Sequence, residues 1–385
     1  MSSLVSLGIV CALGNNGQDV LSNCLRGGQF LSARQDLLPQ RQVMVGAVNS
    51  PLPDMTDFPV EYQSRNNQLA FAAYQQIAEV IKKLNCAPHR LAVILGTSTS
   101  GIAEGEQALA QLDAEGRLPA TYHYTTQEMH APASFIASLS GATGPAYCIS
   151  TACSSSAKAL ISARLLLDAD MADVVITGGV DSLCKLTLNG FAALESVSAG
   201  VCQPFGKARD GINIGEGAAL FVMQKGNNGI RLAGFGESAD AYHISAPHPE
   251  GTGAYQAMHK ALDMAGIVAS SLGYLNLHGT GTPLNDEMES KAVNRLCSQV
   301  PCSSTKALTG HTLGAAGAIE AGICWLLMNQ AEAWLPANQH NGLSDPTLAP
   351  INLLQSIIQV ESLNYCLSNS FAFGGSNVAL LLARE

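Results

Sequence analysis

Two helical stretches with almost no charge constrain the fold of this chain more than any other feature. The stretch 155–167 carries only Lys158 and Arg164 as charged residues. The stretch 312–328 carries only Glu320. A helix that is apolar on nearly every side is buried on nearly every side. We therefore expect a central layer of two helices that lies between two β-sheets.

Short apolar runs alternate with longer helical stretches along the chain, which favours an α/β fold. The helical stretches 65–84 and 285–297 carry polar residues at regular intervals, as is typical of helices with one face in water. One uncharged helix falls in each half of the chain, so the fold is expected to be duplicated. The apolar runs that indicate buried strands are 91–96, 173–180, 218–223, 272–277 and 377–383.

The turn-rich segment GNNG at 226–229 is the expected boundary between the two halves, because a new strand-like segment follows it. The predicted halves are residues 1–228 and residues 229–385, packed into one unit. The chain has no letter-for-letter repeat between them.

Charge argues against several classes of partner. Lys and Arg number 20 and Asp and Glu number 30, so the net charge is −10. An acidic chain lacks the positive surface that nucleic acids and anionic membranes require, and neither is an expected partner. The longest uncharged stretch, 131–157, is interrupted by prolines, glycines and serines, so no membrane insertion is expected.

The cysteines and the N-terminus predict a cytoplasmic protein. Eleven cysteines is an odd number and no two are spaced C-x-x-C, which favours free thiols over a disulfide framework. The apolar start of the chain has no basic residue before Arg26, so we interpret it as a first strand rather than a signal peptide.

Cys153, in TACSSS, comes just before the first uncharged helix. A thiol at a helix N-terminus feels the positive end of the helix dipole and nearby N–H groups, which favour a thiolate and an oxyanion beside it. The small residues Ala152 and 154–156 would leave room for a substrate. Cys153 is therefore a candidate nucleophile, although a role as one of eleven small buried residues is the alternative.

Two histidines occupy comparable positions. His311 comes just before the second uncharged helix, and His278 follows an apolar strand, where a side chain is placed in a cleft. A structural role is the alternative for His278. The turn after it, HGTGTP, offers the hydroxyls of Thr280 and Thr282 to an extended polar substrate. A fourth element, SNSFAFGGSN at 368–377, sets Gly374 and Gly375 beside two aromatic rings.

Taken together, these motifs resemble the β-ketoacyl-[acyl carrier protein] synthases, the condensing enzymes of the thiolase superfamily, in the branch with a Cys-His-His set. The resemblance covers most of the chain, and several ordered motifs are far more specific than one. The matching segments are TACSSS, PFGKARDGINIGEGAAL (204–220), DAYHISAPHPEG (240–251), HGTGTPLND (278–286), KALTGHTLGAAGAIE (306–320) and FAFGGSN (371–377).

The resemblance implies a thiolase-like duplicated fold, a five-layered αβαβα sandwich, with Cys153 in the N-terminal half and both histidines in the C-terminal half. It also implies decarboxylative Claisen condensation: Cys153 takes an acyl group from an acyl carrier protein, and malonyl-carrier then extends it. No metal or redox cofactor is expected, since the substrates travel on the phosphopantetheine of the carrier. The chain would form a homodimer, or a heterodimer with a related non-catalytic subunit resembling a chain-length factor.

The resemblance assigns a role to each site residue. His278 and His311 would donate hydrogen bonds to the enolate that decarboxylation leaves. The backbone N–H groups of Cys153 and Phe373 would form the oxyanion hole, and Phe373 would gate the pocket. The remaining assignments are an ion pair between Lys306 and Glu320 that organises the site, phosphopantetheine binding by Thr280 and Thr282, and structural roles for Asp286 and Glu289 near the start of a helix.

Two residues depart from the family pattern. Ala372 stands before the gating phenylalanine where glycine is common, so a stiffer loop is expected. Gln203 stands before PF where arginine is frequent, which weakens one expected contact with an acidic carrier protein. The motifs serve fatty acid elongation and a dedicated polyketide or aryl polyene system equally. The unusual run TYHYTTQEMH at 121–130 favours a specialised substrate.

Other protein classes fit less well. Thiolases and starter-type synthases pair their cysteine with Cys/His or His/Asn sets, and lack HGTGT followed by KALTGH. A chain-length factor lacks the nucleophile that Cys153 provides. The chain has neither the G-x-S-x-G nor the papain-like motif of hydrolases, and no Walker A or G-x-G-x-x-G nucleotide loop.

Overall fold

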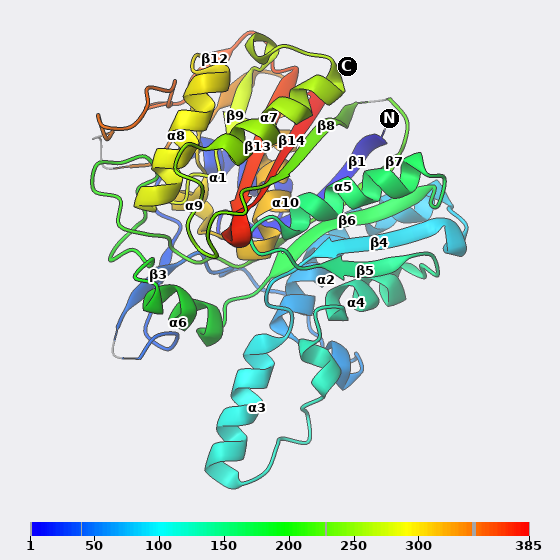
Figure 1. Cartoon of the computed structure of the whole chain (residues 1–385). Coiled ribbons are helices and arrows are strands. Elements are labelled where there is room, and N and C mark those ends of the chain that lie inside the picture. The colour runs from blue at the N-terminus through cyan, green and yellow to red at the C-terminus, as the bar shows by residue number, and fades with distance from the viewer. Residues whose placement is uncertain (1, 40, 228, 341–343, 385) are drawn as a thin grey trace.

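The computed structural model describes residues 2–39, 41–227, 229–340 and 344–384. Asn228, which belongs to the predicted GNNG boundary, lies outside these residues. The described chain contains two sets of five strands, with helices between the sets and outside them (Figure 1).

The two sets of strands have the same topology. If the strands of each set are numbered along the chain, they lie side by side in the order first, fifth, fourth, second and third. The first strand pairs antiparallel with the fifth, and the fifth pairs antiparallel with the fourth. The fourth strand pairs parallel with the second, and the second pairs parallel with the third. The first set comprises β1 (Ser2–Cys11), β4 (Leu91–Gly96), β5 (Ala146–Ile149), β6 (Val174–Asp181) and β7 (Gly217–Lys225). The second comprises β8 (Ile230–Ala239), β9 (Tyr274–Asn276), β10 (Cys302–Ser303), β13 (Tyr365–Ala372) and β14 (Ser376–Arg384).

This repeated order confirms the predicted duplication. The expectation of two separate sheets needs one correction, because the sets join edge to edge through a single residue pair, Ser3 and Arg231, into one ten-stranded sheet. The predicted strand 272–277 is also shorter, since β9 covers only Tyr274–Asn276.

Helices fill the layers as the five-layered αβαβα sandwich requires. The central layer contains α5 (Ser155–Asp168) and α10 (Ala316–Met328), which contact each other and strands of both sets. The outer face of the first set is covered by α2 (Arg65–Leu84) and α4 (Ala131–Ser140), and that of the second by α7 (Thr252–Ala265) and α8 (Pro283–Cys297) (Figure 1).

All but one of the remaining helices and strands lie at the periphery. Helix α3, in cyan in Figure 1, projects away from the layers together with the loop that follows it, so the unusual run at 121–130 belongs to an outlying lobe. Among the described residues, no helix combines the length and the apolar character needed to cross a bilayer. The short helix α9 (Lys306–Thr309) is the exception, since all of its residues are buried. The peripheral elements are α1 (Gly17–Arg26), α3 (Ile102–Glu115), α6 (Lys185–Ala193), β2 (Ser32–Arg34), β3 (Val43–Val45), β11 (Ala333–Leu335) and β12 (Ile358–Val360).

The two central helices approach each other at Gly317. A Cβ atom at this position would lie 2.8 Å from the Cβ of Ala157 and 2.9 Å from its backbone nitrogen. One residue further on, the backbone N–H of Ala318 donates a hydrogen bond to Oγ of Ser156 at 2.8 Å. Small residues and one hydroxyl therefore set the distance between α5 and α10, and with it the distance between the segments that precede them.

We expect Gly317→Ala to lower the free energy of unfolding by about 1–3 kcal/mol, since the added methyl group overpacks a rigid contact. Urea denaturation measures the effect. Gly190→Ala is the matched control: Gly190 is also helical and has nothing within 4 Å of an added Cβ, so this change is neutral or stabilising. Equal stability of the two variants would contradict the close contact.

Candidate active site

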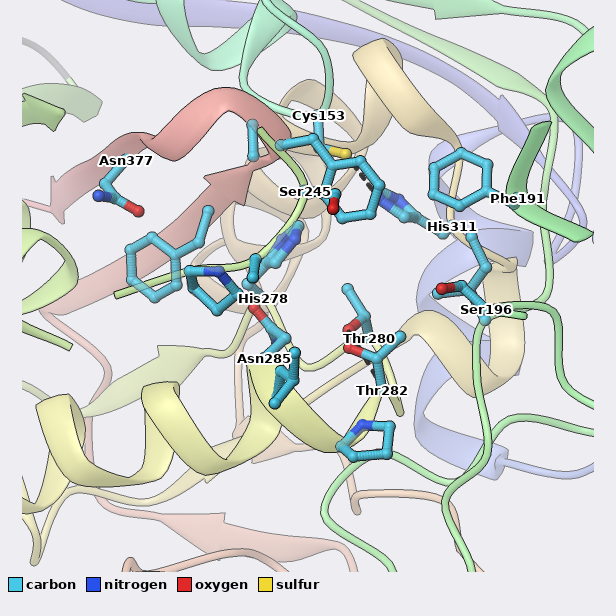
Figure 2. A pocket seen from close by; sticks show the side chains of 18 of the residues that line it. Cys153, Phe191, Ser196, Ser245, His278, Thr280, Thr282, Asn285, His311 and Asn377 are labelled. Carbon is cyan, nitrogen blue, oxygen red and sulfur yellow. Dashed lines mark hydrogen bonds between the residues drawn. The ribbon is translucent and has the colours of Figure 1, made fainter. Parts of the chain in front are cut away.

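Three side chains from distant parts of the chain meet in one buried cluster. Cys153 precedes α5, His278 follows β9, and His311 precedes α10. His311 Nε2 lies 3.0 Å from Cys153 Sγ, and the two imidazole rings are 5.4 Å apart at an angle of 85° (Figure 2). The structure thus brings together all three residues that the sequence pointed to.

The backbone turns sharply just before Cys153. Ala152 has φ +51°, a left-handed conformation that is uncommon outside glycine. Ser155 Oγ donates to the carbonyl of Ala152 at 2.5 Å and accepts from the N–H of Thr151 at 2.9 Å. Ser154 Oγ donates to the carbonyl of Thr151 at 2.8 Å. Ser154 and Ser155 therefore hold this turn, a role that the sequence did not reveal, and the expectation that the small residues leave room for a substrate stays a prediction.

Burial controls the charge of the thiol. It raises the pKa of Cys153 to about 12, against a smaller lowering by Lys306. Loss of hydration therefore outweighs the influences that favour a thiolate at this position. The backbone N–H of Phe373 also hydrogen-bonds to the sulfur, which places a donor where an oxyanion would form. At rest the thiol keeps its proton, and His311 Nε2 is the nearby acceptor.

Both imidazoles are neutral for the same reason. Burial and then the positive charge of Lys306 lower the pKa of His278 and of His311 well below the ordinary value. A neutral imidazole can donate one hydrogen bond and accept another. Each histidine can therefore move or share a proton without a net charge in the cavity.

Lys306 and Glu320 form the predicted ion pair at the base of the site. Both are almost fully buried, and Lys306 Nζ donates to Glu320 Oε1. The same Nζ donates to the backbone carbonyl of His278 at 2.5 Å and lies 3.4 Å from its Nδ1. Burial raises the pKa of Glu320 to about 7 even with Lys306 beside it. Lys306 thus fixes both the main chain and the ring of His278.

Two acidic residues of α8 shape the loops of the site. Glu289 accepts the backbone N–H groups of His278 and Gly279 at 2.8 and 2.7 Å. Asp286 accepts the N–H of Phe205 at 2.8 Å. The contacts of Glu289 extend further than a role at the helix start, since they orient the residue that carries the imidazole.

Asp181 is a further supporting residue that the sequence alone did not reveal. Its Oδ1 accepts four hydrogen bonds from the segment 97–99, and its Oδ2 accepts the N–H of Ala315 at 3.2 Å. Gly314 permits this contact, because a Cβ there would lie 2.8 Å from Oδ2. A carboxylate that ends the buried strand VVITGGVD was the only available signal.

The cluster opens into a cavity of about 170 Å³ (Figure 2). Thr280 and Thr282 line it, with their hydroxyls 2.9 Å apart, and so does Phe373. Gln203 is not among the lining residues. Other lining residues were not singled out from the sequence. The matching motifs contain five of them, Ile212, Asp240, Ser245, Asn285 and Asn377, whereas Phe191 and Ser196 lie outside the motifs.

Phe373 lies at the entrance with its ring 5.4 Å from that of Phe191. It is 38% exposed, and Gly374 and Gly375 follow it with φ +82° and +74°. Ala372 is extended, with φ −98°, a conformation open to any residue. The turn beside Phe373 therefore depends on the two glycines, and the stiffening expected from Ala372 stays a prediction.

One group of side chains among the described residues has the geometry to hold a metal ion, and it is the cluster itself. The ligand atoms of Cys153, His278 and His311 all lie within 4.8 Å of one another. Lys306 directs its ammonium group at Nδ1 of His278, and its positive charge opposes a divalent cation. The donor set fits proton transfer and hydrogen bonding better than metal binding.

Comparison with known proteins identifies the family. The family models for the N-terminal and C-terminal domains of β-ketoacyl synthases match residues 5–228 and 230–341. The 3-oxoacyl-[acyl-carrier-protein] synthase 2 of Staphylococcus aureus is 30% identical over 98% of this chain and 99% of its own. The chain therefore belongs to the β-ketoacyl synthase family, as predicted, and its relatives are acyltransferases.

Two other relatives define the range of the similarity. A synthase 2 of Rhizobium meliloti (strain 1021) is 37% identical, over 63% of this chain and 61% of its own length. A chain of the solved complex of a ketosynthase (ApeO) and its chain length factor (ApeC) from Xenorhabdus doucetiae is 43% identical, with a TM-score of 0.95 over 100% of this chain and 98% of its own. The predicted thiolase-like fold is confirmed by this likeness.

We expect Lys306→Met to destabilise the protein by about 3–5 kcal/mol at pH 8, because Glu320 is left buried without its partner. Loss of Lys306 raises the pKa of Glu320 still further. A carboxyl with a raised folded pKa keeps its full stability below its unfolded value of about 4.5 and loses stability as the pH rises through the folded value. The deficit is therefore smaller at pH 5 than at pH 8.

Urea denaturation at both pH values measures this difference. Lys82→Met is the control, since Lys82 pairs with Glu79 on the surface and its loss leaves stability nearly unchanged. A deficit of Lys306→Met that does not vary with pH would contradict the assignment to Glu320.

Proposed function

We propose that this chain catalyses decarboxylative condensation between an acyl group carried on Cys153 and malonyl-acyl carrier protein. The observation that carries the proposal is the buried cluster in which a protonated thiol lies beside one of two neutral imidazoles. The family match supports the reaction class.

The first half-reaction is acyl transfer. His311 Nε2 accepts the thiol proton while Cys153 Sγ attacks the thioester carbonyl of the acyl-carrier. The negative charge on the carbonyl oxygen is stabilised by the backbone N–H groups of Cys153 and Phe373. The carrier leaves as a thiol, taking up the proton, and the acyl group remains on Cys153.

The second half-reaction is decarboxylation and condensation. Malonyl-carrier loses carbon dioxide, and the resulting enolate oxygen accepts hydrogen bonds from His278 and His311. The enolate carbon attacks the acyl-cysteine carbonyl, the carbon–sulfur bond breaks, and the Cys153 sulfur that is expelled takes up a proton from water. The product is a 3-ketoacyl-carrier. Thr280 and Thr282 are placed to bind the phosphopantetheine arm along the cavity.

Two conditions belong to the proposal. The reaction needs no metal or redox cofactor. The ammonium group of Lys306 beside His278 repels a metal cation and favours neutral imidazoles, which can donate hydrogen bonds to the enolate. The protein works in the cytoplasm, where its cysteines stay reduced; all eleven are free thiols in the structure.

The partners are an acyl carrier protein and a related subunit that acts as a chain-length factor. The 43% identity to a chain of a ketosynthase–chain length factor complex supports this heterodimer over a homodimer, and a specialised chain over primary fatty acids. Native mass spectrometry after co-expression with a related subunit that lacks the cysteine tests the assembly. A stable homodimer that ignores this subunit would overturn it.

Cys153→Ala is expected to abolish covalent acylation by a panel of acyl-carriers, because among the described residues no other cysteine is grouped with the two imidazoles. Intact-mass spectrometry with peptide mapping is the measurement, and its preferred acyl group also identifies the substrate class. Cys86→Ala, at a partly exposed cysteine, is the control and keeps full acylation. Acylation that persists at another cysteine would refute the assignment of the nucleophile.

Substitutions of the two histidines should affect different steps, because of the two only His311 lies within hydrogen-bond distance of the Cys153 sulfur. His311→Ala slows acylation of Cys153 and also carbon dioxide release from malonyl-carrier. His278→Ala suppresses carbon dioxide release about 10²-fold or more but retains acylation. Burst acylation and release of labelled carbon dioxide, measured on each variant, distinguish the two steps. Identical losses in both variants would argue against this division.

A further inference from the structure

Helix α6 carries part of the cavity wall. Phe191, in its last turn, lines the cavity, and its ring lies 5.4 Å from that of Phe373. The N–H of Ser196 donates to the carbonyl of Phe191 at 3.0 Å, and the N–H of Ile212 donates to the carbonyl of Ser196 at 2.8 Å. Ser196 and Ile212 also line the cavity (Figure 2 labels Phe191 and Ser196). We call Phe191, Ser196 and Ile212 the α6 wall.

The sequence of α6 does little to stabilise a helix. The segment KLTLNGFAA contains Asn189 and Gly190, which are weak helix formers. Leu188 is the one buried residue of its nine, all of which the structure describes. Its first turn has no acidic residue, and within the described part of the chain the side chain of the N-cap residue, Cys184, makes no capping hydrogen bond. The helix therefore depends on contacts from elsewhere in the chain.

Glu106 of α3 provides a cap for this helix. Its Oε2 accepts the backbone N–H of Lys185 at 2.9 Å, and its Oε1 accepts that of Leu186 at 2.6 Å. These are the first two N–H groups of α6, and such groups have no partner inside a helix. The negative charge of the carboxylate also interacts favourably with the helix dipole. One side chain thus binds the N-terminus of a helix that lies 79 residues further along the chain.

The part of α3 that carries Glu106 is itself anchored. Oε1 of Glu104 accepts the N–H of Arg65, the first residue of α2, at 2.7 Å. Gly105 leaves no room for a side chain, because a Cβ atom there would overlap Oε1 of Gln127. The first turns of α3 therefore form a fixed base from which Glu106 holds α6.

We propose that Glu106 is a positioning residue for the acyl group on Cys153. Its carboxylate holds α6, and α6 holds Phe191 against Phe373 and fixes the α6 wall. The inference rests on the proposed function, in which an acyl group on Cys153 must fit the cavity that this wall bounds. A fixed wall discriminates between acyl groups by size and shape, whereas a mobile wall accepts several. Glu106 is not among the lining residues, so it acts through α6.

Hydrogen exchange followed by mass spectrometry tests the cap without any substrate. In Glu106→Ala the peptide 185–196 is expected to exchange about fivefold faster or more, because loss of the cap lets α6 open more often. Peptides from α5 and α10 are expected to keep their rates. Glu106→Gln keeps one oxygen that can accept an N–H, so its exchange is expected to lie between those of the native protein and Glu106→Ala.

Asp113→Ala is the matched control for the exchange experiment. Asp113 is an exposed acidic residue of the same helix, α3. Its replacement is expected to leave the exchange of the peptide 185–196 unchanged.

Lys185→Pro tests the contact from the side of α6. Lys185 is the first residue of the helix, where proline is tolerated, and Cys184 before it is extended, with φ −145° and ψ 158°, as a residue before proline must be. The change removes the N–H that donates to Oε2 of Glu106. Glu106→Ala is therefore expected to speed the exchange of α6 by a smaller factor in the Lys185→Pro background. Equal factors in both backgrounds would contradict the contact.

Substrate selection is measured on the enzyme in its native assembly. The ratio of kcat/KM for the preferred acyl-carrier to that for a shorter acyl-carrier is expected to fall about threefold or more in Glu106→Ala. Release of labelled carbon dioxide from malonyl-carrier is expected to stay within about twofold, because the described hydrogen bonds of the buried cluster do not involve Glu106.

Three results would overturn the proposal. They are unchanged exchange of the peptide 185–196 in Glu106→Ala, faster exchange with an unchanged selectivity ratio, or an equal loss of carbon dioxide release and of condensation with every acyl-carrier. A native enzyme that condenses no acyl-carrier would instead refute the proposed function, and the exchange result would still decide whether Glu106 holds α6. The two failures are therefore distinguishable.

Discussion

The contact between α5 and α10 in the central layer determines where the chemistry takes place. Gly317 allows the backbone of α10 to approach Ala157, and Ser156 hydrogen-bonds to Ala318 across the same contact. Cys153 and His311 lie in the segments that enter these two helices, so the packing of small residues holds them 3.0 Å apart. The duplicated fold makes this contact possible, because each half supplies one of the two central helices and one set of strands that covers the helical layer.

The depth of this layer also sets the charges of the site. Removing the cluster from water disfavours a thiolate and an imidazolium alike, and leaves a neutral thiol and two neutral rings. Lys306 and Glu320 are the only charged pair in direct contact with the cluster among the described residues, and each neutralises the other. Negative charge then develops only during the reaction, and it does so where backbone and imidazole donors are already in position.

Much of this could be predicted from the sequence, because local pattern and burial coincide in it. The uncharged stretches became α5 and α10, and the stretch 65–84 became α2 with the same bounds. The motifs also named the residues that meet in the cluster. Asp181 was missed, because its importance comes from contacts with segments far away in the chain. The protonation of Cys153 escaped for a related reason, since burial depends on the whole fold.

The site also bears on why a second subunit would accompany this one. Cys153, His278, His311 and the Phe373 amide all come from one chain, so a partner need add no chemical group. What one chain leaves open is the outlying lobe, where Leu109, Leu118 and Tyr124 are exposed around α3. This lobe follows β4, and β4 leads through the segment 97–99 to Asp181. A partner subunit that packs on the lobe would therefore remove these apolar side chains from water and leave all of the reacting groups to this chain.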